Sequence, residues 1–409
     1  MAIPVTRPTL RRKDLNSVLS CLVSDRIGPG ELSAELAAGL SRRLGAGGGI
    51  CLSSYAAAIA RAVELLGLAP GDSVVMSALT PGIYREVCAR FGIRVALVDI
   101  EERSPLLDVA AVQRMLSGAE RPRALVLHYT FGFLPETDDV LRLGIPVVED
   151  LSHALGGSWN GGPCGSHGQL AILSLQPDGI VTTGQGAALV GRERRTGRAL
   201  GAWSGSYALD QTLPNMNAAL GLAQLRELDR FLQARQDIAE GYLQAVARSP
   251  HGALTAGAQS AGVAPDSEGT TGARDGAPPQ EGTAAQRRAV CYGFAVTVRG
   301  GLKEVRQYAA KRGVETRRAF ADAAVAVQAA PTGDPALAGK GSAPEGQGSA
   351  SEAQAPISQG TEVSSDSPGE AARFPRAHEC LLRSLQFPLY PALARKDIQL
   401  VTRVLASLP

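Results

Sequence analysis

The chain has 409 residues, of which 44% are hydrophobic and 20% are charged, and its formal net charge is +2. This length is sufficient for one or two domains with a large core, and it excludes a small disulfide-dependent scaffold. Charged residues of both signs are spread along the whole chain. The sequence therefore predicts neither a nucleic-acid surface nor a polybasic membrane patch.

The cysteines and the N-terminal segment indicate the environment of the protein. The cysteines are far apart and form no CxxC pair, which argues against a zinc site and against a disulfide framework, so we expect buried, reduced thiols. The N-terminal sequence MAIPVTRPTLRRKDL has no continuous apolar stretch, and no run of about eighteen apolar residues occurs elsewhere. We expect a cytoplasmic protein that does not span a membrane.

Helical and strand-like apolar patterns alternate from about residue 31. They predict helices over 31–45, 55–67 and 81–92, and strands over 49–53, 73–78, 94–99, 123–128, 145–150, 170–174 and 186–190. Runs such as ALVLH and IPVVED are apolar on both faces, as strands covered by helices on each side must be. The pattern is typical of an α/β fold with a largely parallel sheet.

The second part of the chain predicts a smaller unit. A long helix over 216–245 is expected to connect a large domain, residues 1–240, to a small C-terminal α+β domain, residues 241–409. Residues 252–286 and 329–372 contain almost no large apolar side chain, so we expect two disordered insertions. Between and after them we expect a strand at 289–300, a helix at 302–314, and a strand or turn in CLLRSLQFPLYPAL before a closing helix.

Several phrases resemble the nucleotide-sugar aminotransferases of the DegT type. They include CLSSYAAAIARAVELLGLAPGDSVV, VVEDLSHALGGSW, GSHGQLAILSLQP, TTGQGAALV and SLQFPLYPAL, and they run in the family's order from about residue 3 to 240 and again near the C-terminus. The resemblance implies the fold type I architecture of pyridoxal-phosphate transferases, with a three-layer α/β/α large domain. It also implies a nucleotide-sugar ligand and a dimer.

The resemblance places the lysine that would bind pyridoxal phosphate in the segment LSLQPDGIVTTGQGAALV, five residues after Ser174. A pyridoxal enzyme needs this amine because its cofactor is held as a Schiff base. Gly179 stands at this position. The lysines of the whole chain are Lys13, Lys303, Lys311, Lys340 and Lys396. The large domain therefore offers no lysine between residues 14 and 302.

Other positions also depart from the family's pattern. Ser54, Tyr55 and Ala56 stand where the family has Ser-Gly-Thr at a helix N-terminus that binds the cofactor's phosphate, and we expect the tyrosine ring to block the phosphate oxygens. Pro81 stands at the expected place of the ring-stacking aromatic residue, which Tyr84 could replace only if the helix began elsewhere. The Asn and Arg that reach across the family's dimer interface correspond to Asp210 and Thr212.

Some residues match the family's cofactor site. Asp150 matches the partner of the pyridinium nitrogen, with His153 and Ser174 nearby in the motif, and His128 matches another family position. One interpretation is that Asp150, His153 and Ser174 are a vestigial cofactor site. The other is that Asp150 caps the turn after its strand and that the histidine is structural. Asp178 is a candidate base or an ordinary turn residue.

The departures predict a catalytically inactive family member without catalytic residues, metal or cofactor. It would act as a binding protein, or as the partner of an active paralogue in a heterodimer, in sugar or polysaccharide metabolism; a homodimer is equally open. If a cofactor binds, we expect pyridoxal phosphate or pyridoxamine phosphate. The main alternative is an enzyme that holds pyridoxamine phosphate non-covalently and uses Asp150 with His153 or Asp178 on a nucleotide-linked sugar. A working sugar aminotransferase, as the resemblance itself implies, is a further alternative.

Overall fold

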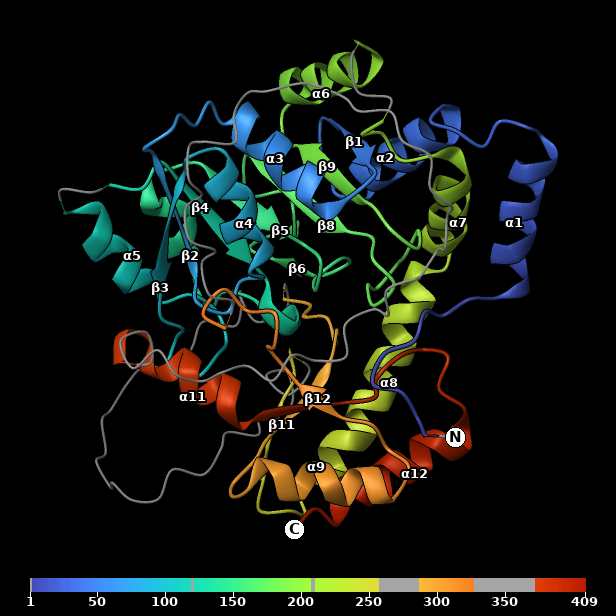
Figure 1. The fold of residues 1–409 in the computed structure, drawn as a ribbon, viewed down its shortest axis with the longest axis vertical. Helices are drawn as coiled ribbons and strands as arrows, with labels where there is room; N and C mark the ends of the chain where they lie inside the picture. Colours follow the sequence, from blue (N-terminus) through green and yellow to red (C-terminus); the bar gives the residue numbers. More distant parts are fainter. Residues whose placement is uncertain (1, 119–120, 207–209, 257–286, 327–371) are drawn as a thin grey trace, which may run out of the picture.

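The computed structural model describes residues 2–118, 121–206, 210–256, 287–326 and 372–409. Within these residues the fold has a larger unit on a seven-stranded sheet and a smaller unit on a four-stranded sheet. Helix α8 (Leu228–Val246) leads from the larger unit into the smaller one (Figure 1). The predicted boundary at residue 240 falls inside this helix, and the division into domains stays a prediction.

The large sheet is formed by the apolar runs of the first half of the chain. Its strands lie in the order β1 (Gly48–Leu52), β9 (Ala187–Gly191), β8 (Leu170–Ser174), β5 (Val147–Asp150), β4 (Ala124–His128), β2 (Ser73–Ser77) and β3 (Arg94–Val98). Strand β9 runs antiparallel to both of its neighbours, and the other pairings are parallel. The predicted α/β fold with a largely parallel sheet is confirmed.

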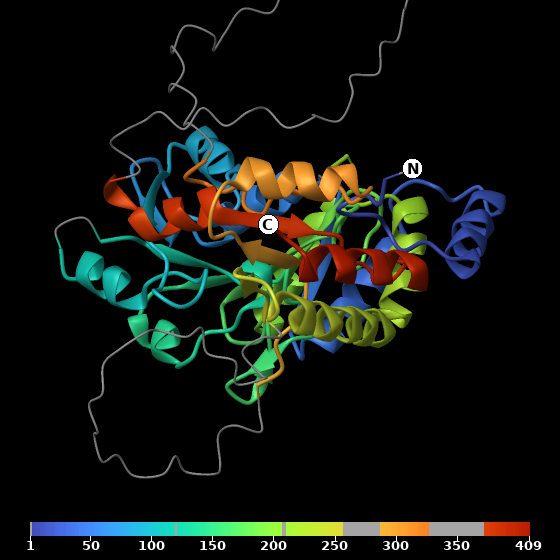
Figure 2. The same ribbon diagram turned by 90° about the horizontal axis from the view of Figure 1, so that it is seen from below.

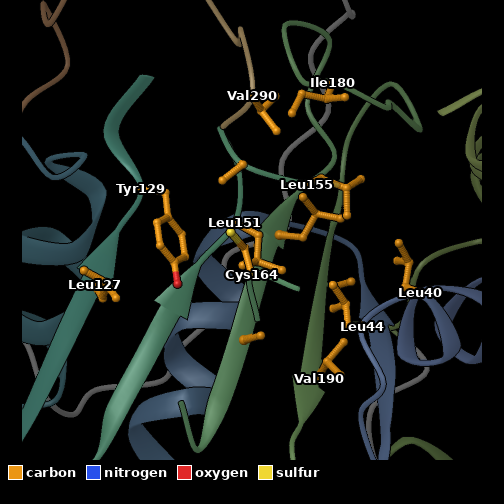
Figure 3. Packing of buried hydrophobic residues seen from close by; sticks show 14 of the residues in the cluster. Leu40, Leu44, Leu127, Tyr129, Leu151, Leu155, Cys164, Ile180, Val190 and Val290 are labelled. Carbon is orange, nitrogen blue, oxygen red and sulfur yellow. The ribbon is translucent and has the colours of Figure 1, made fainter. Parts of the chain in front are cut away.

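Helices cover both faces of this sheet and bury its apolar side chains in two separate cores. One core contains residues of α2 (Glu31–Arg43) and α5 (Val109–Leu116); Figure 3 shows part of it, with Leu40 and Leu44 on the helix side and Leu127 on the sheet. The other core contains residues of α3 (Tyr55–Leu65), α4 (Ile83–Arg90) and α6 (Arg194–Ser206). The result is a three-layer α/β/α unit.

Further short elements complete the larger unit. These are α1 (Arg12–Val23), the 3₁₀ turns η1 (Thr130–Gly132) and η2 (Asp139–Leu143), the hairpin of β6 (Ser158–Trp159) and β7 (Gly162–Pro163), and α7 (Asn215–Arg226). The prediction of one helix over 216–245 is wrong at Glu227, where α7 ends and α8 begins. Glu227 pairs with Arg11 and Arg230 at this junction, and the change of direction lets α7 pack on α1 and α2.

The smaller unit is an antiparallel sheet covered by helices (Figure 2). Its strands lie in the order β10 (Gly252–Leu254), β11 (Phe294–Thr297), β13 (Ser384–Phe387) and β12 (Arg317–Arg318). The helices are α9 (Leu302–Lys311), α11 (Pro375–Arg383) and α12 (Arg395–Ala406). Side chains of α8, β11, β13 and α12 form its core.

Two predictions for this part of the chain are wrong in detail. Residues 252–256, which we expected in a disordered insertion, are described and include β10; residues 257–286 and 329–371 lie outside the described residues. The segment before β13, expected to be a strand or turn, begins as α11 because Pro375 starts a helix with a strongly one-sided apolar pattern. The six cysteines, all within the described residues, form no disulfide bonds, and five are buried. None of the described helices has the length and apolarity needed to cross a bilayer.

A buried carboxylate fixes the loop that follows the β6–β7 hairpin. Glu149 of β5 is completely buried, and its oxygens accept hydrogen bonds from the Tyr129 hydroxyl and from the backbone N–H groups of Gly165, His167 and Gly168. The Trp159 indole donates to the same tyrosine oxygen at 2.9 Å. One carboxylate thus holds three backbone donors that have no partner within a strand or helix.

Glu149→Ala should lower the free energy of unfolding by at least about 3 kcal/mol, because it leaves several buried donors unpaired at once. Urea denaturation of the variant measures this change. Glu240→Ala is the matched control: Glu240 lies on the exposed face of α8, where it accepts a hydrogen bond from Gln236, and its loss should change stability by less than about 0.5 kcal/mol. Equal effects of the two variants would contradict this account of Glu149.

Candidate functional site

Polar side chains converge at the carboxyl ends of the central strands. β4 ends with His128, β5 with Asp150 and β8 with Ser174, and these strands are neighbours that run in the same direction. In open α/β sheets this edge is where ligands bind. The structure therefore brings together three of the residues that the sequence singled out.

Asp150 is completely buried, and donors from its own chain occupy its carboxyl group. Its Oδ2 accepts hydrogen bonds from the hydroxyl groups of Tyr55 and Tyr84, the second at 2.7 Å. Its Oδ1 accepts the backbone N–H of Ser152 at 2.9 Å, so Asp150 does cap the turn after β5. Burial, followed by the nearby Asp150, raises the pKa of both tyrosines well above the usual value. Both hydroxyls are therefore protonated donors.

The position of Tyr55 corrects an expectation about the phosphate site. We expected its ring to block phosphate oxygens at the start of α3, but its hydroxyl reaches Asp150, and its ring meets that of Tyr84 edge to face at 5.9 Å. At the helix N-terminus the Ser54 side chain accepts the N–H of Ala57 at 3.1 Å. Tyr84 is buried beside Asp150 and does not serve as a replacement stacking residue facing the cavity.

His153 lies between the two units. Its Nδ1 accepts the backbone N–H of Phe131 at 3.2 Å. Its ring stacks on that of Tyr292 of the smaller unit, with 3.7 Å between the ring centroids, and meets the His128 ring edge to face, with 4.7 Å between the centroids. Burial and then the neighbouring His128 lower the pKa of His153 well below its usual value, and burial lowers that of His128. Both imidazoles are neutral, and the contacts of His153 are those of a residue that holds the two units together.

The loop after β8 has no room for a side chain at the position of the missing lysine. A Cβ on Gly179 would lie 2.8 Å from the backbone oxygen of Val181 and 3.1 Å from that of Gln176. The Gly179 N–H bonds to Gln176 O at 3.0 Å, which closes the predicted Pro-Asp-Gly turn. Asp178 pairs with Arg317 of the smaller unit at 3.7 Å, and Ser174 donates to Gln176 at 3.3 Å.

A cavity of about 460 Å³ opens between this edge of the large sheet and the β12 segment of the smaller unit. Its lining includes Tyr55 and His153 but neither Asp150 nor Tyr84. The polar side chains that face it carry both hydrogen-bond donors and acceptors. They are Glu86, Ser152, Ser174, Gln176, Asp178, Arg317, Arg318 and Asp322.

Sequence reasoning missed the contribution of the smaller unit to this cavity. Tyr292, Arg317 and Arg318 come from segments that show no site motif, and only the fold brings them next to the loop after β8. Two candidates do not join the site: Asp210 is exposed, and Thr212 is buried beside β1, where it lines a different cavity.

Comparisons with known proteins agree with this architecture. Two solved forms of the putative sugar aminotransferase Spr1654 of Streptococcus pneumoniae, with pyridoxamine phosphate and with pyridoxal phosphate, superpose with a TM-score of 0.76. The pyridoxamine form is 18% identical, and the match covers 100% of this chain and 98% of the other. The aminotransferase TlmJ of Streptoalloteichus hindustanus gives a TM-score of 0.73 at 21% identity, with 99% and 98% of the two chains covered. The fold is that of the fold type I pyridoxal-phosphate aminotransferases.

Sequence comparison assigns the family. The model of the DegT/DnrJ/EryC1/StrS aminotransferase family matches residues 8–264, and the chain belongs to this family. It is 29% identical over 267 residues to the UDP-4-amino-4-deoxy-L-arabinose–oxoglutarate aminotransferase of Shewanella sediminis, covering 59% of this chain and 68% of the relative. It is 28% identical over 276 residues to the GDP-perosamine synthase of Caulobacter vibrioides, covering 62% and 74%.

The residues of the site do not fit a covalently held pyridoxal phosphate. Such a cofactor needs a lysine amine and an acid whose carboxylate faces the pyridinium nitrogen. Among the described residues that line the cavity there is no lysine, and a side chain at Gly179 would collide with backbone oxygens. The Asp150 carboxyl group is turned to Tyr55 and Tyr84.

The backbone oxygens close to Gly179 predict that a side chain added there lowers stability. Gly179→Ala should destabilise the fold by about 1–3 kcal/mol, because the added methyl group is forced against the oxygen of Val181. Gly241→Ala in helix α8 is the control, because a Cβ there meets nothing within 4 Å and should stabilise the helix by up to about 1 kcal/mol. Thermal and urea unfolding would measure both. A neutral Gly179→Ala would show that the loop can accept a side chain.

Proposed function

We propose that this chain is a family member that does not catalyse transamination and that binds a nucleotide-linked sugar in the cavity without converting it. The observation that carries the proposal is the loop at Gly179, which has neither the lysine nor the space for one. Without an amine there, the internal Schiff base that starts transamination cannot form.

The cavity supports a polyhydroxylated ligand. Arg317 and Arg318 provide guanidinium donors, and Asp178 and Asp322 provide carboxylate acceptors on the same lining. Two relatives are named for reactions on a UDP-sugar and a GDP-sugar, which makes nucleotide-linked sugars the first ligands to test. A cytoplasmic location remains a prediction from the sequence.

The proposal predicts no lysine adduct when the purified protein is titrated with pyridoxal phosphate or pyridoxamine phosphate. Absorbance and calorimetry would follow binding, and borohydride reduction with mass spectrometry would locate any adduct. UDP-4-amino-4-deoxy-L-arabinose and GDP-perosamine would be titrated in parallel, and one of them should bind saturably. Arg318→Ala should weaken that binding about tenfold, whereas Arg312→Ala, in which the lost side chain lies over Tyr308 on the smaller unit, should not.

Each result has a distinct meaning. A reducible lysine adduct together with transamination of a keto-sugar would overturn the proposal and make the chain a sugar aminotransferase. Pyridoxamine phosphate binding without an adduct would support the non-covalent enzyme instead. Absence of any nucleotide-sugar binding would refute the ligand half of the proposal while leaving its non-catalytic half standing.

We further propose that the partner of this chain is a second copy, which packs against helix α1. Large apolar side chains are at least a third exposed at eight of the described positions, and seven of these are on or beside this helix. The seven, which we call the α1 surface, are Leu10, Leu15, Leu19, Leu22, Val23, Ile27 and Met216. Figure 1 shows α1 at the periphery next to α7. An apolar patch of this kind marks an interaction site.

Charge favours a second α1 in the opposite direction. The helix carries exposed Arg12 and Lys13 at its N-terminal end, where the helix dipole is also positive. Its C-terminal end is the negative end of the dipole and is followed by exposed Asp25, while the next residue, Arg26, pairs with Glu31. Antiparallel packing across a twofold axis places the positive end of each helix dipole, with its two basic side chains, against the negative end of the other. A partner with a uniformly apolar surface would not pair with the charges at the two ends of α1.

Leu19→Asp should weaken self-association at least tenfold, because it buries a carboxylate in the apolar contact. Sedimentation equilibrium of the wild-type chain and the variant measures this. Leu382→Asp is the control, since Leu382 is 36% exposed but lies on α11, far from the α1 surface in the chain. A dimer that resists Leu19→Asp would exclude the α1 surface as its interface, and a wild-type monomer would leave a heterodimer as the open alternative.

A further inference from the structure

We propose that the Tyr55 ring occupies the space beside Asp150 that a cofactor ring would need. The wild-type chain would then bind neither pyridoxal phosphate nor pyridoxamine phosphate, even non-covalently. Shortening Tyr55 should open a pocket that accepts a pyridine ring. The inference deepens the proposed function, since it explains why the cavity is free to hold a sugar ligand alone.

Tyr55, Tyr84 and Asp150 are arranged so that one of them lies between the cavity and the carboxyl group. Tyr55 both touches Asp150 and lines the cavity, whereas Asp150 and Tyr84 do not line it. Tyr55 is thus the side chain that separates the cavity from the carboxyl group. A pyridine ring whose nitrogen is to reach Asp150 from the cavity must occupy the volume of the tyrosine ring.

The Asp150 carboxyl group receives its hydrogen-bond donors from the chain itself. A buried carboxyl group without donors is costly, and a pyridinium N–H is one group that can supply a donor. Here the hydroxyls of Tyr55 and Tyr84 and the N–H of Ser152 supply donors from the chain itself. The carboxyl group therefore has donors in the absence of any ligand, and a pyridinium N–H would compete with them for its oxygens.

The surroundings of the Tyr55 ring would leave a defined space if the ring were removed. Tyr55 is 6% exposed, and Tyr84 packs against its edge at 5.9 Å. Removing the ring leaves an aromatic-sized space with Tyr84 on one side, the Asp150 Oδ2 with one of its two donors lost at its end, and an opening to the cavity where Tyr55 was. Such a space is suited to a flat cationic ring.

The test is the Tyr55→Ala variant of the full-length chain, titrated with pyridoxamine phosphate and with pyridoxine, which lacks the phosphate and so does not depend on the altered helix N-terminus. Calorimetry and absorbance should show binding at least tenfold tighter than that of the wild-type chain. Adding Asp150→Asn to Tyr55→Ala should remove most of the gain, because a neutral amide oxygen accepts a pyridinium N–H much more weakly than a carboxylate does.

Tyr129→Ala is the matched control. Tyr129 is also a buried tyrosine whose hydroxyl binds a buried carboxylate, that of Glu149, but it does not line the cavity. This variant should lose stability without gaining affinity for either probe. If Tyr55→Ala does not fold, Tyr55→Leu keeps part of the apolar packing while removing the hydroxyl end, and is judged by the same titration.

Two results would overturn the inference. One is specific binding of pyridoxamine phosphate by the wild-type chain, lost in Asp150→Asn. The other is a folded Tyr55→Ala or Tyr55→Leu variant with no gain for either probe. Failure of the proposed function looks different, since it would appear as a lysine adduct or as turnover of a keto-sugar by the wild-type chain.

Discussion

A carboxyl group at the buried end of a central strand sets the main constraint on this molecule. Asp150 has no solvent exposure, so its oxygens must find donors within the fold or in a ligand. The side chains of Tyr55 from α3 and Tyr84 from α4 meet this need, and Ser152 completes it from the backbone. Two helices on one face of the sheet are thereby tied to the strand end, and both oxygens of this carboxyl group have donors from the chain itself.

The layout of the large unit could be predicted because both faces of its sheet are covered. Strands such as ALVLH then need apolar residues at every position, and this pattern stands out in the sequence. Short or polar helices were harder to predict from the sequence: α5 has only eight residues, and α6 offers few apolar residues. The break at Glu227 is hidden in a continuous helical pattern. At that break Glu227 pairs with Arg11, a residue distant in the chain.

The candidate site could be predicted in its composition but not in its geometry. The residue types at 54–56 and 179 indicated that cofactor contacts differ from the family's pattern, because each difference alters a specific donor or amine, whereas Asp150 matches the pattern. The direction of the Tyr55 side chain could not be read in this way, since it depends on Tyr84 and on the space above β5. Tyr292 and Arg317 were missed because their contacts with His153 and Asp178 join the two units of the fold.

The crowding at Gly179 bears on the evolutionary history of the site. A lysine restored there would first have to push apart the oxygens of Val181 and Gln176, and its amine would then find no cofactor ring to bind, because Tyr55 fills the approach to Asp150. Removing Tyr55 first would take one of three hydrogen-bond donors from a buried carboxyl group and leave a cavity in the fold. If the chain is non-catalytic as proposed, each single substitution toward a lysine-bound cofactor would thus lower stability and gain no activity. Gly179 and Tyr55 would then have to change together, which makes the present pair of residues hard to replace one at a time.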